Sequence, residues 1–523
     1  MAAIGFVTRR NDRLKKCSPF NRSLSSFSFS FSQSGENENE IESDLGSLRS
    51  GCPLRETSRF GDISTPPCAA RGSVLIIVMW ICLGLVALTL YFANSMSSEL
   101  RAADNRAAEI AARQAIAAGT RYAASVLAQY AIGGVVPDIA DYKSEAVPVG
   151  EDAKFWFIGR SYDALPSQQL SNEPYFALVD ESSKLNLNTV TSAMLQALPL
   201  PGMTPEFADA IVAWRSANSQ NAAINDNYYS QLTPPRHNKG SAYETVDELR
   251  LINGAMLDLI LGEDINRNGV LDVNEDDAET SAPRDDQNGQ LLAGLFEYVT
   301  VYSSVPATSA SGSRRINVST LTTQQARQQL QTRLTQRGIP SQRAAQSMSR
   351  IPFSATNPNQ NQALTSVADF MVTTRMTADE WVLVHTDLTA TTATNGIAQG
   401  LVNVNTAGVA VLSAIPGIGP EKAEALVAYR AANPDQLTSF AWLTQVMSTG
   451  DIRRAGRYIT DQSYQFSADI AGVGANGRGY CRAKVIFDMS TGRPRIINRQ
   501  DYTSFGWALG AATRRILRGT NEI

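Results

Sequence analysis

Histidine is scarce in this chain of 523 residues, which has only two. His237 and His385 stand in unrelated polar contexts, so we expect each to be a surface or loop residue and not a catalytic base. The sequence also has no nucleophile elbow, no zinc-ligand pair and no phosphate-binding glycine loop. We therefore predict that the protein is not an enzyme.

Cysteine is almost absent from the second part of the chain. Three of the five cysteines lie in the first 72 residues, Cys82 lies in an apolar run, and only Cys481 follows. An intramolecular disulfide needs two cysteines, so none can form beyond the apolar run. Packing or a bound metal must supply the stability of that part.

An excess of positive charge is missing as well. The segment before Ser73 holds ten of the 46 basic and eight of the 50 acidic residues, so the remainder carries six more acidic than basic residues. A protein that binds nucleic acid without sequence preference normally shows a basic excess, because neutralising phosphates supplies its affinity. The charge balance argues against that function.

One long apolar run is present, VLIIVMWICLGLVALTLYFA at residues 74–93. About 20 apolar residues are enough for a helix to cross a hydrocarbon core of roughly 30 Å. A secretory signal would be shorter and would end at a small-residue cleavage site, whereas an alanine-rich amphipathic pattern continues here to Tyr130. We expect one continuous helix over residues 73–130 that anchors the protein in a membrane.

The residues just before this run predict proteolytic processing. Gly72 follows Arg71, so a peptidase at the cytoplasmic face could cut after Gly72 and leave Ser73 as the new amino terminus. This layout is similar to that of type IV pilin-like precursors, most of which have glutamate at the fifth mature position; here that position is Ile77. The preceding residues 1–72 are polar and of low complexity, and we expect a disordered leader that is removed. The alternative is a plain single-pass anchor with a glycine at its edge.

An internal repeat occupies the middle of the chain. The segment KLNLNT at residues 184–189 recurs as RINVST at 315–320 and as LVNVNT at 401–406. In each copy, Asn and Thr can cap a short amphipathic helix, a turn with Pro or Gly reverses the chain, and a second helix follows. We predict three helix-hairpin-helix modules, each followed by a further short helix, which together form an all-helical domain.

A loop with the spacing of a calcium site follows the first copy. Side-chain oxygens stand at positions 1, 3, 5, 9 and 12 of residues 264–275, and position 6 is Gly269. Calcium takes about six to eight oxygen ligands, the glycine permits a sharp turn, and a final glutamate can bind through both oxygens. A polar turn without a metal is the alternative. We predict a structural calcium site whose ligands are Asp264, Asn266, Asn268, the Val270 carbonyl, Asp272 and Glu275.

The third copy contains a turn that could bind phosphate. Gly417 and Gly419 precede a helix that opens at Pro420, and free backbone N–H groups at such a turn can hold a phosphate. However, residues 402–447 hold two basic and three acidic residues, whereas the basic middle copy, residues 315–372, lacks this turn. We therefore expect the turn to serve module packing rather than nucleic-acid binding.

Several motifs, taken in order, resemble those of the minor pseudopilin K family of type II secretion systems. The resemblance implies an α+β pseudopilin fold, in which a long N-terminal transmembrane and amphipathic helix packs on a small antiparallel sheet that carries a large inserted helical domain. The motifs are Arg71-Gly72 with no acid at Ile77, VDE at 179–181, KLNLN at 184–188, YETVDEL at 243–249, GEDINRNG at 262–269, YVTVY at 298–302 and GW at 506–507.

The same resemblance implies a function and partners. It implies cleavage by prepilin peptidase, an inner-membrane anchor with the soluble part in the periplasm, and a position with minor pseudopilins I and J at the tip of a pseudopilus of major pseudopilin. There the subunit would initiate or cap assembly for the export of folded proteins across the outer membrane. A membrane-anchored DNA receptor of the competence type and a calcium-dependent surface adhesin are the alternatives.

Short strands are predicted at five places in the chain. Residues 155–158, 175–180, 295–302, 483–488 and 495–497 read as short strands. The predicted organisation is a leader at 1–72, the anchor helix at 73–130, the first part of the sheet at 131–183, the first helical module with the calcium loop at 184–294, a returning strand at 295–314, the second and third modules at 315–460, and the last strands of the sheet at 461–523.

Overall fold

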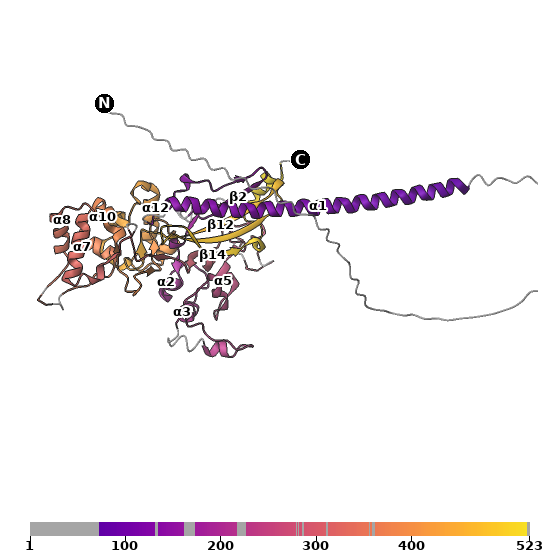
Figure 1. Ribbon diagram of the computed structural model, residues 1–523. Helices are drawn as coiled ribbons and strands as arrows, with labels where there is room; N and C mark the ends of the chain where they lie inside the picture. The colour runs from indigo at the N-terminus through magenta and orange to yellow at the C-terminus, as the bar shows by residue number, and fades with distance from the viewer. Residues whose placement is uncertain are drawn as a thin grey trace, which may run out of the picture. The chain divides into compact units, whose positions relative to one another are not determined.

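Figure 1 shows a computed structural model of the protein. Contacts divide the chain into two units, Met1–Ile81 and Cys82–Ile523. The predicted disordered leader, including Gly72, lies outside the described residues. The structure describes residues 73–130, 134–161, 173–216, 226–278, 280, 282–284, 287–309, 312–354, 356–357 and 361–519.

The first element is the long helix α1, Ser73–Tyr130, which confirms the predicted continuous helix of 58 residues. Within the described residues, it is the one helix long and apolar enough to cross a membrane, and its most apolar window has a mean hydropathy of 2.7. No residue of that window is buried, and Ile77 is 57% exposed. These properties fit the predicted membrane anchor.

An antiparallel sheet follows α1 and returns at the end of the chain. Its strand order is β1-β2-β12-β13-β14, and β3 pairs with β12 beside β2. The predicted strands at 155–158, 483–488 and 495–497 are confirmed, but only the last two residues of 175–180 form a strand. The strands are β1 Val147–Val149, β2 Ala153–Ile158, β3 Val179–Asp180, β12 Gln465–Val473, β13 Cys481–Asp488 and β14 Arg495–Asp501.

Small residues let α1 pack closely on this sheet. Ala112, Ala115 and Ala123 of α1 are fully buried in a core shared with Phe157 and Ile470. Gly472 lies directly under α1, and a Cβ atom there would meet the carbonyl oxygen of Ala112. Alanine and glycine thus allow a helix–sheet contact that larger side chains would prevent. The mixed α+β character predicted from the sequence is confirmed.

The three repeats form three modules with one plan. Each module begins with a short strand, continues with two helices joined by a turn, and ends with a second strand parallel to the first. The predicted helix-hairpin-helix units are confirmed, but the insertion is not all-helical, because each module contains this strand pair. The elements are β4 Leu185–Asn186, α2 Ser192–Gln196, α3 Pro205–Trp214 and β5 Val299–Thr300; β7 Ile316–Asn317, α7 Gln324–Gln336, α8 Ser341–Ser349 and β8 Leu388–Thr389; and β10 Val402–Asn403, α11 Val409–Ser413, α12 Gly419–Ala432 and β11 Ile459–Thr460.

The asparagine that recurs in each repeat explains the parallel strand pairs. The side-chain oxygens of Asn186, Asn317 and Asn403 accept the backbone N–H two residues later, at 2.8 to 2.9 Å. Their amide groups donate to the chain just past the partner strand, where Ser303, Thr391 and Ser463 accept at 2.7 to 3.2 Å. One asparagine therefore shapes the turn after the first strand and ties the second strand to it.

Each module also contains further short helices. One predicted strand, at residues 295–302, is wrong. Residues 295–302 begin as helix α6 and continue as β5, which pairs with β4 and not with the large sheet. Leu295 and Val299, four residues apart, both face the core of the modules, a spacing typical of a helix. The remaining elements are η1 Ile139–Asp141, η3 Glu181–Ser183, η4 Val246–Leu251, α5 Leu257–Leu261, α6 Leu295–Tyr298, β6 Ser304–Val305, η5 Val318–Thr320, α9 Val367–Thr374, α10 Ala378–Val384, η7 His385–Asp387, β9 Ala398–Gln399, η8 Pro434–Gln436, η9 Phe440–Trp442, α13 Leu443–Val446, α14 Thr449–Ala455, η10 Ala475–Gly477, η11 Thr503–Phe505 and α15 Gly510–Arg518.

Candidate functional site

The predicted calcium ligands lie together in one closed loop. The Asp264 carboxylate accepts the backbone N–H groups of Asn268 and Gly269 at 2.9 and 2.8 Å. At the other end, the Glu275 carboxylate accepts the N–H groups of Asn266 and Asp272, both at 3.1 Å. Gly269 has a φ of 82°, which glycine adopts without strain. The loop therefore folds back on itself, as the sequence spacing predicts.

Asp272 lies between Asn266 and Asn268, two of the other predicted ligands. The amide nitrogens of Asn266 and Asn268 donate to one Asp272 oxygen at 2.6 and 2.9 Å. Three carboxylates, two amide oxygens and a carbonyl form a donor set that suits calcium. No three His, Cys, Asp or Glu side chains are grouped as a metal site anywhere in the described part of the chain. Calcium binding stays a prediction.

Burial makes the negative charge of the loop costly. Burial, together with the neighbouring Asp264 carboxylate, raises the pKa of the Glu275 carboxyl to about 7. Burial also raises the pKa of Asp264, although the Arg160 guanidinium opposes that shift. A cation in the loop would remove this cost, because it would compensate the carboxylates that repel one another.

Two arginines dock the loop on the sheet. Arg482 of β13 is fully buried and donates to the carbonyl oxygens of Asn266 and Arg267, the latter at 2.8 Å. Arg160, two residues after β2, donates to the carbonyl oxygens of Arg267 and Asn268 at 3.1 and 3.2 Å. Three consecutive carbonyls of the loop are therefore held by guanidinium groups of the sheet domain. No sequence pattern points to these two arginines, because each lies more than 100 residues from the loop.

The C-terminal segment covers the same loop. The amide groups of Asn266 and Asn268 donate to the carbonyl oxygens of Trp507 and Ala508, at 3.3 and 3.5 Å. The Arg267 guanidinium lies over the rings of Phe296 and Phe505, at 4.4 and 4.8 Å from the centroids. Such cation–π contacts are attractive and fix the direction of the side chain. The loop thus joins the first module, the sheet and the end of the chain.

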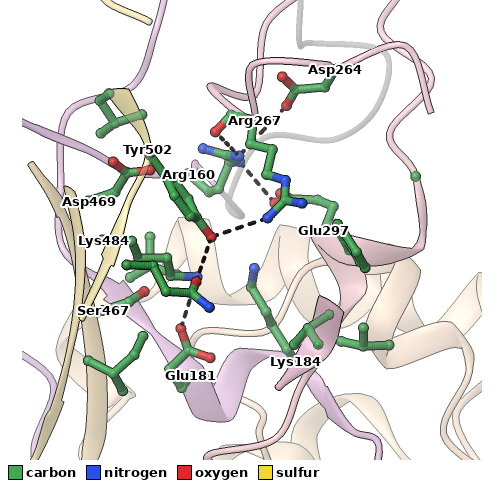
Figure 2. Close-up of a pocket in the computed structure, with 18 of the residues that line it drawn as sticks. Arg160, Glu181, Lys184, Asp264, Arg267, Glu297, Ser467, Asp469, Lys484 and Tyr502 are labelled. Atoms are coloured by element: carbon green, nitrogen blue, oxygen red, sulfur yellow. Dashed lines mark hydrogen bonds and ion pairs between the residues drawn. The ribbon is translucent and has the colours of Figure 1, made fainter. Parts of the chain in front are cut away.

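A charged cavity of about 90 Å³ lies beside the loop, between the sheet and the first module. Figure 2 shows its charged residues, which come from both parts. Lys484 of β13 pairs with Glu181 at 3.5 Å. Burial opposes the charge of Lys484, but Glu181 and neighbouring groups more than offset this effect and raise its pKa. The charged residues labelled there are Arg160, Glu181, Lys184, Asp264, Arg267, Glu297, Asp469 and Lys484.

A second polar contact joins the sheet to the third module. One oxygen of Asp180 accepts the hydroxyl groups of Thr406 and Ser463, at 2.5 and 2.6 Å, and lies 3.4 Å from the amide of Asn403. Asp180 is buried, and burial raises its pKa to about 6. A single carboxyl group of β3 thus bonds to three residues around the β10–β11 pair.

The predicted phosphate turn is covered by its own chain. Gly417 packs against α14, where a Cβ atom would lie 2.8 Å from Cβ of Arg454. Lys422, the nearest basic residue of the turn's own helix, pairs with Asp451 of α14 at 3.2 Å. Gly419, the second glycine, has a φ of 72° and begins α12. A covered turn whose lysine already has a carboxylate partner does not favour a phosphate ligand.

The two histidines have different environments. His237 is exposed, as predicted, and lies 3.3 Å from Asp226. The surface prediction is wrong for His385, which is only 7% exposed and pairs with the buried Asp461 at 2.9 Å. Its imidazole also lies against the ring of Trp381. Its burial depends on partners distant in sequence, which the polar residues around it do not reveal.

Comparisons with known proteins match two parts of the chain. Residues 176–260 match the family model of type II secretion system protein K, and residues 398–448 match that of the helix-hairpin-helix motif. Neither family model describes an enzyme. The crystal structure of the GspK-GspI-GspJ complex from the enterotoxigenic Escherichia coli type 2 secretion system is similar at 10% identity, covering 75% of this chain and 95% of that chain, with a TM-score of 0.32. No curated protein matches the chain significantly. The chain therefore carries the protein K domain of type II secretion systems over residues 176–260, which confirms the resemblance that its motifs indicate.

Proposed function

We propose that the protein is a minor pseudopilin K at the tip of a type II secretion pseudopilus, where it initiates or caps assembly for the export of folded proteins across the outer membrane. The observation that carries this proposal is the protein K domain at residues 176–260. The helix α1 supports it, because an exposed apolar segment precedes a segment packed on the sheet. The role is structural, not enzymatic.

The two parts of α1 suit different tasks in a filament. The apolar residues 74–93 are exposed in the single chain and would be covered either by lipid or by the equivalent helices of neighbouring subunits. One face of the alanine-rich part, from Ala108 to Leu127, is covered by the chain's own sheet. The insertion at residues 184–460 is a large addition to such a subunit, and its bulk would leave no room for another subunit to stack above.

The missing acid at Ile77 agrees with a terminal position. A carboxylate at this place would pair with the terminal amine of a neighbouring subunit, whereas Ile77 has no charge to offer. A subunit at the tip has no further subunit above it, so the missing carboxylate would cost it little. We further propose minor pseudopilins I and J and the major pseudopilin as partners, an inner-membrane anchor, and a soluble part in the periplasm.

Calcium would complete the loop at residues 264–275. The carboxylates of Asp264, Asp272 and Glu275, the side-chain oxygens of Asn266 and Asn268 and the Val270 carbonyl would hold the ion. A bound cation would supply positive charge to a buried loop that now has to accommodate three carboxylates. Arg160 and Arg482 hold the loop backbone on the sheet, so a rigid loop would stiffen the joint between the sheet and the first module.

Mass spectrometry of the full chain tests the processing step. The protein is expressed with prepilin peptidase and purified from membranes, and we expect an amino terminus at Ser73 with residues 1–72 removed. Gly72→Val should block the cut. Gly84→Ala, a change in the same helix at a glycine with no atom near the added Cβ, should leave the cut intact. A chain that keeps its first 72 residues in the presence of the peptidase contradicts the proposal.

Co-purification tests the tip assembly. Minor pseudopilins I and J, expressed with the processed chain, should elute with it as one complex, whereas a DNA receptor would shift duplex DNA at physiological salt without them. The tip proposal is wrong if neither pseudopilin co-elutes from membranes in which all three proteins are present and processed.

A further inference from the structure

A second and larger cavity lies between the second and third modules. Its volume is about 450 Å³, and sites for small organic ligands in proteins have volumes of about 300 to 1,000 Å³ and are common where two domains meet. The second module lines the cavity with Leu364 and Leu388, the third module lines it with Phe440 and Ile459, and Gln399 of β9 lines it as well. This cavity has no part in the function proposed above.

The cavity has an exposed rim and a buried apolar wall. Thr392, Gln399 and Arg457 line it and are exposed to solvent, whereas Leu388 and Phe440 line it and are buried. Within the described part of the chain, the side chains of Thr392, Gln399 and Arg457 form no hydrogen bond or ion pair. A ligand that entered from the solvent would meet free polar groups first and apolar side chains deeper in the cavity.

Basic residues outnumber acidic ones in this cavity. The described residues that line it include Arg315, His385 and Arg457 but a single acid, Asp461. Asp461 pairs with His385 at 2.9 Å. Burial opposes both charges of this pair, but the attraction between the two groups more than offsets it, so the pKa of His385 is raised and the pKa of Asp461 is lowered. The acid is therefore already compensated, and two arginines remain.

Arg315 is buried among neutral hydrogen-bond acceptors. Its Nη2 group donates to the Gln462 side chain at 2.8 Å and to the Tyr464 hydroxyl at 2.7 Å. Its other two bonds are longer, at 3.3 and 3.5 Å, and go to the carbonyl oxygens of Thr308 and Leu388. A guanidinium group has five N–H donors, so these contacts leave one donor of Nη1 over. A buried guanidinium that has no hydrogen-bonded carboxylate favours an anion nearby.

The acids that flank the lining residues in the chain have arginine partners of their own. Asp387 pairs with Arg337 at 2.5 Å, and Asp369 pairs with Arg453 at 3.1 Å. Each of these pairs adds one negative and one positive charge to the surroundings. The net charge around the cavity therefore stays positive when they are counted.

Charge and surface together select a ligand chemistry. A carboxylate forms strong, charge-assisted hydrogen bonds with a guanidinium group such as that of Arg457. The buried side chains of Leu388 and Phe440 offer apolar surface, which an inorganic anion would leave unused. The cavity therefore suits a molecule that has both a carboxylate and a hydrocarbon group.

We propose that this cavity binds a carboxylate carried by a short apolar group, with the carboxylate at Arg457 and the apolar group against Leu388 and Phe440. A small organic acid and the C-terminal residue of a peptide both present these two groups. The bound ligand would connect the second and third modules, since its partners come from both. This inference does not depend on calcium binding or on the position of the protein in a filament.

Isothermal titration of the full chain in a nonionic detergent tests the carboxylate. The probes are N-acetylleucine and N-acetylleucinamide, which share the apolar group and differ in charge. We expect the acid to bind and the amide to bind at least about tenfold more weakly, because the amide cannot form a charge-assisted hydrogen bond. Equal binding of the two probes contradicts the proposal, as does a lack of binding of the acid at millimolar concentration.

A tripeptide distinguishes the two sources of the carboxylate. Acetyl-Ala-Ala-Leu with a free carboxylate is titrated beside N-acetylleucine. Tighter binding of the tripeptide identifies the end of a peptide as the ligand, whereas equal affinities identify a small organic acid, and both results support the site. A tripeptide amide that binds as tightly as the tripeptide acid refutes it.

Two arginine variants test the place of binding. Arg457→Met should fold, because the residue is exposed, and should lower the affinity for N-acetylleucine by about tenfold or more. Arg493→Met removes another exposed arginine, which lies in the turn between β13 and β14, and should bind like the wild type. Equal affinities in the wild type and in the Arg457 variant would show that the acid binds elsewhere.

Thermal unfolding gives an independent measurement. N-acetylleucine at about ten times its dissociation constant should raise the midpoint of the wild-type protein by about 1 to 2 °C, because a ligand that binds only the folded state stabilises it. The amide at the same concentration should have no such effect, and neither should the acid on the Arg457 variant. A rise of the same size in either control would refute the assignment.

Discussion

Arg482 of β13 and Asp469 of β12 form a buried ion pair with two hydrogen bonds, at 2.8 and 2.6 Å. The same guanidinium donates to the carbonyl oxygens of Asn266 and Arg267 in the loop of the first module. One side chain thus joins two neighbouring strands and a loop more than 200 residues earlier in the chain. Arg482 is the cation that hydrogen-bonds directly to Asp469, so the pair should matter strongly for stability.

We expect Arg482→Met to lower the free energy of unfolding by about 3 to 5 kcal/mol, because it leaves Asp469 buried without a partner and frees the loop carbonyls. Urea unfolding followed by tryptophan fluorescence measures the change. The control is Arg499→Met, which removes an exposed arginine from β14 and should change stability by less than about 0.5 kcal/mol. Equal losses in the two variants would show that the buried pair contributes little.

Calcium should raise the thermal midpoint of the wild-type protein. At about 100 times its dissociation constant, a ligand specific for the folded state adds about 2.7 kcal/mol. Glu275→Gln should abolish this effect, since it removes the ligand that can bind through both oxygens. Asp276→Asn, at the exposed next position, should retain it. Isothermal titration with calcium checks the same comparison, and heat of binding in the Glu275 variant would refute the predicted ligand set.

Asp180 should make stability depend on pH. Burial raises its pKa in the folded state to about 6, whereas an aspartate in an unfolded chain titrates near 4. The folded protein therefore binds this proton more tightly, which favours folding below about pH 4. That contribution is lost as the pH rises through about 6.

We expect the wild-type protein to lose up to about 3 kcal/mol of unfolding free energy between pH 4 and pH 7, relative to Asp180→Asn. Groups other than Asp180 titrate in both proteins and cancel in the difference. Urea unfolding at several pH values measures it. Parallel stability curves for the two proteins would mean that Asp180 titrates at its ordinary pKa when folded.

Gly472 should not tolerate a side chain. Its Cβ position is occupied by the carbonyl oxygen of Ala112 in α1, so Gly472→Ala should push the helix from the sheet and cost about 1 to 3 kcal/mol. Gly450→Ala, at a site where the nearest atom to the added Cβ is 3.8 Å away, is the matched control. Urea unfolding of both variants tests the contact, and an unchanged stability of Gly472→Ala would contradict it.

The sequence predicted the features that local patterns determine. The apolar run and the alanine-rich stretch after it give α1, the recurring asparagine segments give the three modules, and the oxygen spacing after Asp264 gives the closed loop. The docking of that loop could not be predicted, because Arg160 and Arg482 reach it from strands far away in the chain. The prediction for residues 295–302 is wrong for a similar reason. An apolar run of that length suits a strand or a helix, and packing against the core of the modules favours the helix α6 at its start.

The paired strands at the base of each module have a further consequence. Since the first and last strands of a module lie side by side, the chain leaves each module next to the place where it entered. Duplicating or deleting a whole unit would therefore leave its flanking segments at nearly the same separation.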